Sequence, residues 1–355
     1  MKILVINPGS TSTKVAIYED ERELFMENIS IEADELKKYK TLYDQLDMRY
    51  RQVMDFLKKC RISEAELDVI ASRGGMLPPV RSGAYVIDDK LVEVLRYRPS
   101  HLHASNLGAM IAHKIAAPRA IPAFIYDSVA VDELSQVARL SGIKGRDRRS
   151  FSHVLNTRAV AREYCSEKGL DYLKSTLIVA HLGGGISVNI QKDGKVVDVV
   201  TAEEGPFSPE RAGGLQVTTC VEICKNEGVE MLEKYESGEG GIMSYLGTKD
   251  VREVERRISA GDNEAQIVYR AMAYQVAKAI GSLATVTDGK IDAILLTGGM
   301  AHSKILTEWI REHVQFIAPV YTYPGEFEMQ ALALGALRVM RNQESARRIE
   351  QDLNE

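Results

Sequence analysis

Two stretches of the chain align without a gap: LVINPGSTSTKVAI at residues 4–17 and LIVAHLGGGISVNI at residues 177–190. Each is an apolar run, a turn of small residues and an alternating run, a pattern typical of strand, tight turn and strand. Each is followed by a further strand candidate, at residues 24–31 and 195–200. Leu4 aligns with Leu177, and the offset of 173 positions between them is constant along both stretches. This offset is about half of the chain length. It predicts two similarly folded halves.

The rest of the chain alternates between helical and strand patterns. The helical patterns lie at residues 35–60, 105–117, 155–168, 249–260, 264–286, 303–314 and 328–348, and the apolar strand patterns at 67–71, 121–126 and 293–296. Hairpins combined with strands that alternate with helices predict an α/β fold with mixed sheets.

The polar run GRDRRS at residues 145–150 indicates a domain boundary. We therefore expect a first domain at residues 1–148 and a second at residues 149–330. The last helical pattern is predicted to cross back onto the first domain, which adds residues 331–355 to it.

Composition excludes several classes of protein. Of the 355 residues, 45% are hydrophobic and the net charge is −5, which argues against a nucleic-acid partner. No run approaches the roughly 18 apolar residues of a membrane span, so no membrane partner is expected. The opening MKILVINPGS is too short for a signal peptide, and a cytoplasmic location is predicted. The four cysteines fit buried thiols, although Cys220 and Cys224, one helical turn apart, leave a metal contact open.

The turn between Asn7 and Lys14 carries groups suited to phosphate. Pro8 and Gly9 break the strand, and residues 10–13 then offer four hydroxyls before the lysine charge. Small residues let backbone N–H groups approach phosphate oxygens, and the lysine neutralises them. The segment is not a Walker A loop, because the GxxxxGK[ST] pattern is absent. An ordinary polar hairpin turn is the alternative.

Glycines mark two further points of close approach. Gly183, Gly184 and Gly185 follow His181 in the second hairpin, where three glycines have an entropic cost and suit a backbone that contacts a ligand. Gly298 and Gly299 follow a strand and precede a helix, a placement that suits a nucleotide's sugar or α-phosphate. The three motifs together predict an ATP cleft between the two domains.

These motifs resemble a known family. NPGSTSTK at residues 7–14, HLGGGIS at 181–187 and TGGM at 297–300 are similar to the two phosphate loops and the adenosine loop of acetate and propionate kinases and their butyrate-kinase relatives. SRGG at 72–75, EGPFSPERAGGL at 204–215 and PGE at 324–326 most resemble butyrate and branched-chain fatty-acid kinases.

The resemblance implies a fold and an activity. The fold would be two duplicated actin-like (ribonuclease H-like) domains with mixed sheets flanked by helices and the ATP cleft between them. The activity would be reversible transfer of the ATP γ-phosphoryl group to butyrate or a short branched-chain fatty acid. ATP and Mg²⁺ would be the cofactors, and a homo-oligomer, as a dimer or a multiple of dimers, is expected.

The chemistry of such a transfer indicates which side chains matter. A fatty-acid carboxylate is ionised at pH 7, so no general base is needed, and cations must stabilise the transferring phosphoryl group. Arg73 and Arg211 lie beside glycines outside helical patterns, although either could be a solvated surface group. Asp127 ends a strand, and a carboxylate at this place in an α/β fold often faces the active cleft. The alternative is that Asp127 caps the next helix.

The resemblance assigns further roles. It implies catalytic roles for Arg73, Asp127, His153 and Arg211, and nucleotide contacts at Asn7, Ser10, Ser12, Lys14, His181, Gly183, Gly184, Gly185, Asp250, Arg252, Gly298, Gly299 and Met300. His153 departs from the family pattern, because Phe151 is shifted relative to the usual glycine–phenylalanine pair. Asn7 and Glu326 match the Mg²⁺ ligands, and Glu328 competes with Glu326 because the local alignment can slip by two positions.

The sequence leaves other functions to consider. An actin-like ATPase without carboxylate kinase activity would share the fold. A non-catalytic sensor would lack Asn7, Arg73 or Arg211, and all three are present, which argues against it. An acetate or propionate kinase would share the mechanism. The binding free energies of acids that differ by one methylene differ by roughly 1–3 kcal/mol in an apolar pocket. The preferred acid therefore depends on the shape of the pocket.

Overall fold

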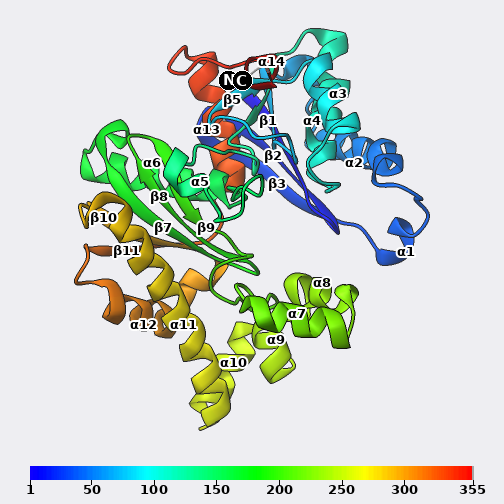
Figure 1. The fold of residues 1–355 in the computed structure, drawn as a ribbon. Coiled ribbons are helices and arrows are strands. Elements are labelled where there is room, and N and C mark those ends of the chain that lie inside the picture. The colour runs from blue at the N-terminus through cyan, green and yellow to red at the C-terminus, as the bar shows by residue number, and fades with distance from the viewer. Residues whose placement is uncertain (354–355) are drawn as a thin grey trace. The chain divides into compact units, whose positions relative to one another are not determined.

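The computed structural model describes residues 1–353 and divides the chain into two compact units. Unit 1 comprises residues 1–132 and the C-terminal segment from Phe327, and unit 2 comprises residues 133–326. Each unit contains one mixed sheet with helices packed on it (Figure 1). The predicted α/β class is therefore found in both.

Unit 1 is built on a six-stranded sheet in the order β3-β2-β1-β4-β6-β5. Its strands are β1 (Lys2–Pro8), β2 (Ser12–Glu19), β3 (Arg22–Ser30), β4 (Val69–Ser72), β5 (Ala84–Val86) and β6 (Ala123–Tyr126). Strands β1, β4 and β6 run parallel, whereas β2, β3 and β5 pair antiparallel with their neighbours. The carboxyl ends of the three parallel strands therefore meet at one edge of the sheet.

The helices of unit 1 are α1 (Ala33–Leu36), α2 (Leu46–Lys59), α3 (Asp89–Tyr97), α4 (Asn106–Ala116), α13 (Glu328–Met340) and α14 (Glu350–Leu353). Helix α13 contacts β1, β4 and β6, so the end of the chain completes the core of its beginning. Gly335 of α13 lies so close to the Tyr126 ring that a Cβ would stand 2.4 Å from it. Only glycine allows this approach.

Unit 2 is built on a five-stranded sheet in the order β11-β10-β7-β8-β9. Its strands are β7 (Thr176–Leu182), β8 (Ile186–Lys192), β9 (Lys195–Val200), β10 (Ala293–Gly298) and β11 (Val320–Pro324). Its helices are α5 (Gln136–Arg139), α6 (Val154–Lys168), α7 (Val217–Asn226), α8 (Val229–Ser237), α9 (Gly241–Leu246), α10 (Val251–Ser259), α11 (Asn263–Ala284) and α12 (Lys304–Val314).

Alternation along β7 separates the two faces of this sheet. Ile178, Ala180 and Leu182 join the apolar core that includes α11. His181, between two of them in sequence, points to the other face and meets Asn156 of α6. The sequence pattern thus places α6 and α11 on opposite faces.

The predicted duplication is visible in the backbone. The order β9-β8-β7-β10-β11 repeats β3-β2-β1-β4-β6 with the same strand directions. A register shift falls between Ile17 and Tyr18 in one copy and between Ile190 and Gln191 in the other. Asp20 and Asp193 both adopt a left-handed conformation, with φ of 52° and 51°. Both features recur at the 173-position offset.

The two hairpins differ by one residue at the turn. Pro8 pairs with Thr13 and encloses four residues, whereas Leu182 pairs with Ile186 and encloses three. The gapless sequence match does not reveal this slip. The glycines of the second turn allow the tighter connection.

The structure differs from the expected boundaries in two places. Residues 133–148 belong to unit 2, not to the first domain, because Ser135 N donates to Val197 O and Arg148 pairs with Asp198 of β9. The pattern at 328–348 gives a helix only to Met340. The following segment is extended where Arg347 N donates to Ala84 O, next to β5.

Some elements were not predicted. They are α3, α5, α14, β5, β11 and the group α7–α9. The long pattern at residues 35–60 also divides, because α1 ends at Leu36 and α2 begins at Leu46. In the described part of the chain, none of the helices has the length and apolar character that a membrane crossing requires.

Candidate functional site

Three predicted site residues lie at the same edge of the unit 1 sheet. Asn7 stands near the end of β1, Arg73 directly follows β4, and Asp127 directly follows β6. Because these strands are parallel, their carboxyl ends bring the three residues to one edge. Lys14 joins them, because it is the β2 residue that pairs with Asn7.

Asn7, Arg73 and Glu328 form one polar cluster. Asn7 Nδ2 donates to Glu328 Oε2 at 2.8 Å, and Arg73 Nη1 donates to the same oxygen at 3.1 Å. Arg73 Nη1 also approaches Asn7 Oδ1 at 3.4 Å. Glu328 is the first residue of α13, so the C-terminal segment brings it here. The carboxylate that the structure joins to Asn7 is thus Glu328, the competitor of Glu326.

Asp127 is held in an unusual backbone conformation. Its φ is 40°, and its side chain is buried. Its Oδ1 accepts from Gly83 N at 2.8 Å, and its own N–H donates to Gly83 O at 3.1 Å. A non-glycine residue with positive φ is uncommon and persists only where its surroundings fix it. Asp127 does not cap a regular helix here, which removes the alternative explanation.

His181 of unit 2 is oriented by a buried hydrogen bond. Asn156 Nδ2 lies 2.9 Å from His181 Nδ1 and 3.2 Å from Thr297 Oγ1. An amide nitrogen only donates, so Nδ1 accepts and the neutral ring carries its proton on Nε2. A Cβ on Gly183 would stand 2.8 Å from that Nε2. His181 therefore presents a donor to the glycine turn.

His153 is stacked on His181. The ring centroids are 3.9 Å apart and the rings lie within 10° of parallel. His153 Nδ1 lies 2.9 Å from Ser187 Oγ, and Ser187 is fully buried in β8. The structure thus joins two predicted site residues that are far apart in sequence.

The third glycine motif lies beside the second. Gly298 ends β10 with φ of 93°, and a Cβ on it would stand 2.3 Å from Leu182 O. Only glycine fits there. Gly298 also exchanges backbone hydrogen bonds with Gly325 at 3.1 and 3.0 Å. Gly299 and Met300 continue into the short 3₁₀ helix that follows, and Glu326 comes directly after Gly325.

Arg211 lies against the second glycine turn. A Cβ on Gly185 would stand 3.4 Å from Arg211 Cζ. Within the described residues, the buried Nε of Arg211 has no hydrogen-bond partner in the protein. Arg211 lines a groove of about 590 Å³ together with Glu203 and Glu236. Burial, aided by the Glu203 charge, raises the pKa of Glu236, and Arg211 partly opposes this rise.

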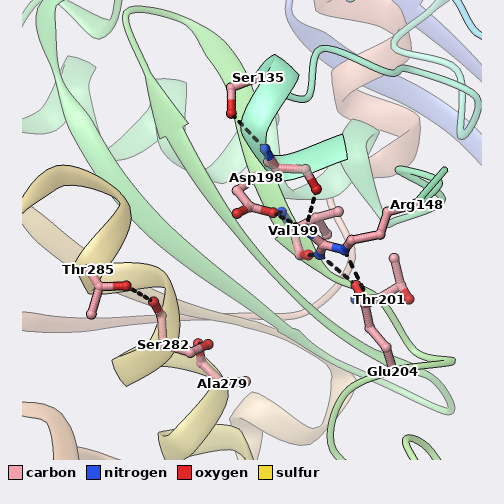
Figure 2. A network of polar contacts seen from close by, with 10 residues as sticks. Ser135, Arg148, Asp198, Val199, Thr201, Glu204, Ala279, Ser282 and Thr285 are labelled. Carbon is pink, nitrogen blue, oxygen red and sulfur yellow. Dashed lines mark hydrogen bonds and ion pairs between the residues drawn. The ribbon is translucent and has the colours of Figure 1, made fainter. Parts of the chain in front are cut away.

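Arg148 is used inside unit 2 as a structural cross-link, which Figure 2 shows. Its Nη1 donates to Asp198 Oδ1 at 3.0 Å and to Ala138 O at 2.7 Å. Its Nη2 donates to Glu204 Oε1 at 2.8 Å and to Val199 O at 2.5 Å. The hydrogen bond with Glu204 raises the pKa of Arg148 above its ordinary value. The segment before His153 is thereby attached to β9 and to the loop that leads to Arg211.

Asp250 and Arg252 bind each other. Arg252 Nε donates to Asp250 Oδ1 at 2.9 Å and Nη2 donates to Oδ2 at 3.0 Å. Asp250 is the N-cap of α10 and accepts from Arg252 N. The Arg252 side chain is 85% exposed. A helix cap accounts for this pair, and its contact with a nucleotide stays a prediction.

Sequence reasoning missed two residues that support these turns. Arg49 of α2 is fully buried and donates to the carbonyl groups of the first turn. It occupies the buried stripe of its helix, four positions before Val53 and seven before Phe56. A charged residue on an apolar stripe is the signal that could have identified it. Asn156, which orients His181, follows His153 by three positions and carries no comparable signal.

Comparisons with known proteins agree with these motifs. Residues 142–319 match the model of the acetokinase family. A protein of Caldanaerobacter subterraneus subsp. tengcongensis described as probable butyrate kinase 2 is 48% identical over 347 residues, which cover 97% of this chain and 98% of the relative.

Solved structures show the same fold. Porphyromonas gingivalis acetate kinase superposes with a TM-score of 0.78 at 20% identity, over 97% of this chain and all of that one. A propionate kinase of Francisella tularensis superposes with a TM-score of 0.75 at 18% identity, over 94% of this chain and 98% of that one. The predicted fold of two related α/β halves is confirmed.

Proposed function

Because the chain belongs to the acetokinase family, we propose that it transfers the γ-phosphoryl group of ATP to butyrate or a short branched-chain fatty acid. The products are ADP and an acyl phosphate, and the reaction is reversible. The sequence motifs resemble those of butyrate kinases, which agrees with the 48% identity to a probable butyrate kinase over nearly the full length of the chain. That relative supports butyrate over acetate as the acid.

One observation carries the phosphoryl-transfer part of the proposal. Arg73 stands at the same sheet edge as the end of β1, from which the turn of Ser10 and Ser12 leads. A guanidinium beside a turn rich in hydroxyl and N–H donors suits a transferring phosphoryl group.

The reaction needs few protein groups to form and break bonds. A carboxylate oxygen of the acid attacks the γ-phosphorus, an acyl O–P bond forms, and the bond between the γ-phosphorus and the bridging oxygen breaks. No proton is transferred at the attacking oxygen, since the acid is already ionised. Arg73 and Arg211 stabilise the charge on the transferring group, and Asp127 is proposed to orient an arginine or a metal-bound water.

His153 and His181 are proposed to donate hydrogen bonds to phosphate oxygens. Ser10, Ser12, Lys14, Gly183, Gly184 and Gly185 are the proposed phosphate contacts. Gly298, Gly299, Met300, Asp250 and Arg252 are the proposed contacts with the rest of the nucleotide.

Mg²⁺ fits the residues gathered in unit 1. Asn7 and Glu328 supply oxygen donors, which Mg²⁺ prefers, and one or two such ligands suffice when phosphates and waters complete the shell. Residues 1–353 contain no cluster of three or more His, Cys, Asp or Glu that would hold a metal alone. Bound Mg²⁺ neutralises charge on the phosphates. Glu326, which the resemblance implies, is the competing ligand.

We also propose a homo-oligomer, a dimer or a multiple of dimers, that acts in the cytoplasm, where ATP is available. Helices α7 and α8 have no fully buried residue and expose Val217, Val221 and Val229, which supports association through apolar contacts. Light scattering after size-exclusion chromatography measures the mass, and a monomer would contradict this part.

A hydroxamate assay tests the proposed activity. Purified protein is incubated with MgATP, hydroxylamine and, in turn, acetate, propionate, butyrate, isobutyrate and isovalerate. The expected result is acyl hydroxamate that forms fastest with the four- and five-carbon acids. Fastest turnover of acetate would agree with the proposed mechanism but contradict the proposed preference for butyrate or a branched-chain acid. Steady ATP hydrolysis without any hydroxamate would overturn carboxylate kinase activity and indicate an ATPase of the same fold.

A further inference from the structure

Arg49 is a fully buried arginine whose donors are directed at the first phosphate turn. It lies in the first turns of α2 and has 0% exposure. Its Nη1 donates to Gly9 O at 2.9 Å and to Ser12 O at 3.0 Å, and its Nη2 donates to Ser10 O at 3.1 Å. A single guanidinium thus binds three carbonyl groups of one four-residue turn.

The remaining bonds fix the guanidinium itself. Its Nε and Nη2 both donate to Gln45 Oε1, at 3.2 and 3.0 Å, and its Nη1 donates to Thr13 Oγ1 at 3.1 Å. Gln45 stands at the start of the same helix. The arginine is therefore held from both sides, by its own helix and by the turn.

All four carbonyl groups of the turn are directed into the protein. The fourth, Thr11 O, accepts from Ile31 N at 2.8 Å. Within residues 1–353, the N–H groups of Ser10 and Thr11 have no acceptor in the protein, and both residues are exposed. Since a peptide's N–H and C=O point in opposite directions, inward carbonyl groups turn these N–H groups outward. Outward N–H groups are what a phosphate requires.

The charge of Arg49 is not cancelled locally. In the described chain its hydrogen bonds go to backbone carbonyl, hydroxyl and amide oxygens, all of which are neutral. Burial alone lowers its pKa to about 10, with no carboxylate to oppose this. Arg49 therefore stays charged at pH 7, and its positive charge lies beneath the exposed donors. A buried, unpaired cation is costly in the free protein and favourable when a polyanion binds above it.

We propose that Arg49 is a positioning residue for ATP: it holds residues 9–12 with their carbonyl groups inward, so that N–H and hydroxyl groups face the phosphates. The proposal rests on the ATP dependence in the proposed function. Arg49 is thereby proposed to strengthen the binding of the phosphates and not that of the adenosine. It requires no contact between Arg49 and the nucleotide.

The test compares the affinities of Arg49 variants for ATP and for adenosine, measured by isothermal titration calorimetry on the full chain. Arg49→Gln is expected to raise the Kd for ATP at least about tenfold, since hydrogen bonds to a charged group are lost, and to leave the Kd for adenosine within about twofold. Arg49→Lys keeps the charge and some donors, so its Kd for ATP should lie between that of the wild type and that of Arg49→Gln. Arg51→Gln is the matched control, because Arg51 is exposed on the same helix, and both of its Kd values should equal those of the wild type.

A merely structural role would give a different pattern. Equal losses of ATP and adenosine affinity in Arg49→Gln, or no loss of either, would overturn the proposal. Should Arg49→Gln fail to fold, Gln45→Ala decides: it removes one support of the guanidinium and should raise the Kd for ATP about threefold. Unchanged ATP affinity in that variant would also overturn the proposal. Wild-type protein that binds ATP but forms no acyl phosphate would overturn the proposed function and leave this inference standing.

Discussion

Arg73 Nη1 lies 3.1 Å from Glu328 Oε2, although 255 positions separate the two residues in the chain. The ion pair is largely shielded, with side-chain exposures of 26% for Arg73 and 14% for Glu328. Asn7 donates to the same oxygen. One carboxylate oxygen thus accepts from a proposed catalytic cation and from a proposed metal ligand, and Mg²⁺ bound at Glu328 would compete with Arg73 for that oxygen.

This arrangement predicts which glutamate controls the response to Mg²⁺. Glu328→Gln removes the carboxylate charge next to Asn7, so the Mg²⁺ concentration for half-maximal activity should rise at least about tenfold. Glu326→Gln is the matched control, two positions away, and should behave like the wild type. Titration of activity with Mg²⁺ at saturating ATP measures both. A large shift for Glu326→Gln alone would show that Glu326, as the motif resemblance implies, is the ligand.

The two arginines should be needed for turnover and not for folding. Arg73→Ala and Arg211→Ala are each expected to lower kcat about 10²- to 10³-fold, which is the typical effect of removing one donor to transition-state charge. Lysine at either position should restore activity only in part, because the planar fork is lost. Arg22→Ala, at a side chain that is 72% exposed, is the control. Near-normal kcat in either alanine variant, with an intact melting curve, would contradict the assigned role.

The sequence revealed the architecture through the repeat. The apolar runs and small-residue turns predicted both hairpins, and β4, β6 and β10 were recognised as buried strands because each is a short apolar run. Strand β5 was not recognised, since three residues carry too little periodicity, and α7 and α8 were not recognised because they bury no residue fully. A pattern of burial cannot appear where little is buried.

Site residues could be predicted where they lie in a turn of distinctive composition or directly after a strand. They could not be predicted where a contact between distant parts of the chain places them. Asn7, Arg73 and Asp127 follow strands, so their common edge could be inferred from strand positions. Glu328 and Glu326 could not be separated, because only the start of α13 determines which one reaches Asn7. The position of Arg49 on the apolar stripe of its helical pattern indicates that its side chain is buried, but the sequence does not show that it binds a turn 40 positions earlier.

Arg148 should matter for stability. Arg148→Gln removes the cation that binds Asp198 and Glu204 and the donors to Ala138 O and Val199 O, so the free energy of unfolding should fall by about 2–3 kcal/mol. Arg146→Gln, at an exposed position in the same loop, should change it by less than about 0.5 kcal/mol. Urea denaturation measures both. Equal stability of the two variants would show that the network in Figure 2 contributes little.

Glu236 should make stability depend on pH in the opposite direction to an ordinary paired carboxylate. Burial and the Glu203 charge raise the pKa of Glu236 in the folded protein above its ordinary value of 4.5. Between these two pKa values the folded state binds more protons than the unfolded state, so this group's contribution to stability falls as pH rises through the folded pKa. Above the folded pKa the charged side chain therefore carries its full cost.

Glu236→Gln removes that cost and should raise the melting temperature at pH 8. The gain in free energy should stay below about 1 kcal/mol, because the side chain is only partly buried and solvent screens it, and because the favourable interaction with Arg211 is lost as well. The difference from the wild type should shrink as pH is lowered toward 4.5, where the wild-type carboxylate becomes neutral. Glu233→Gln, at an exposed position of the same helix, should show no such trend. Thermal melts at pH 8, 7, 6 and 5 decide: a gain that grows toward acid would mean that Arg211, and not burial, dominates the environment of Glu236.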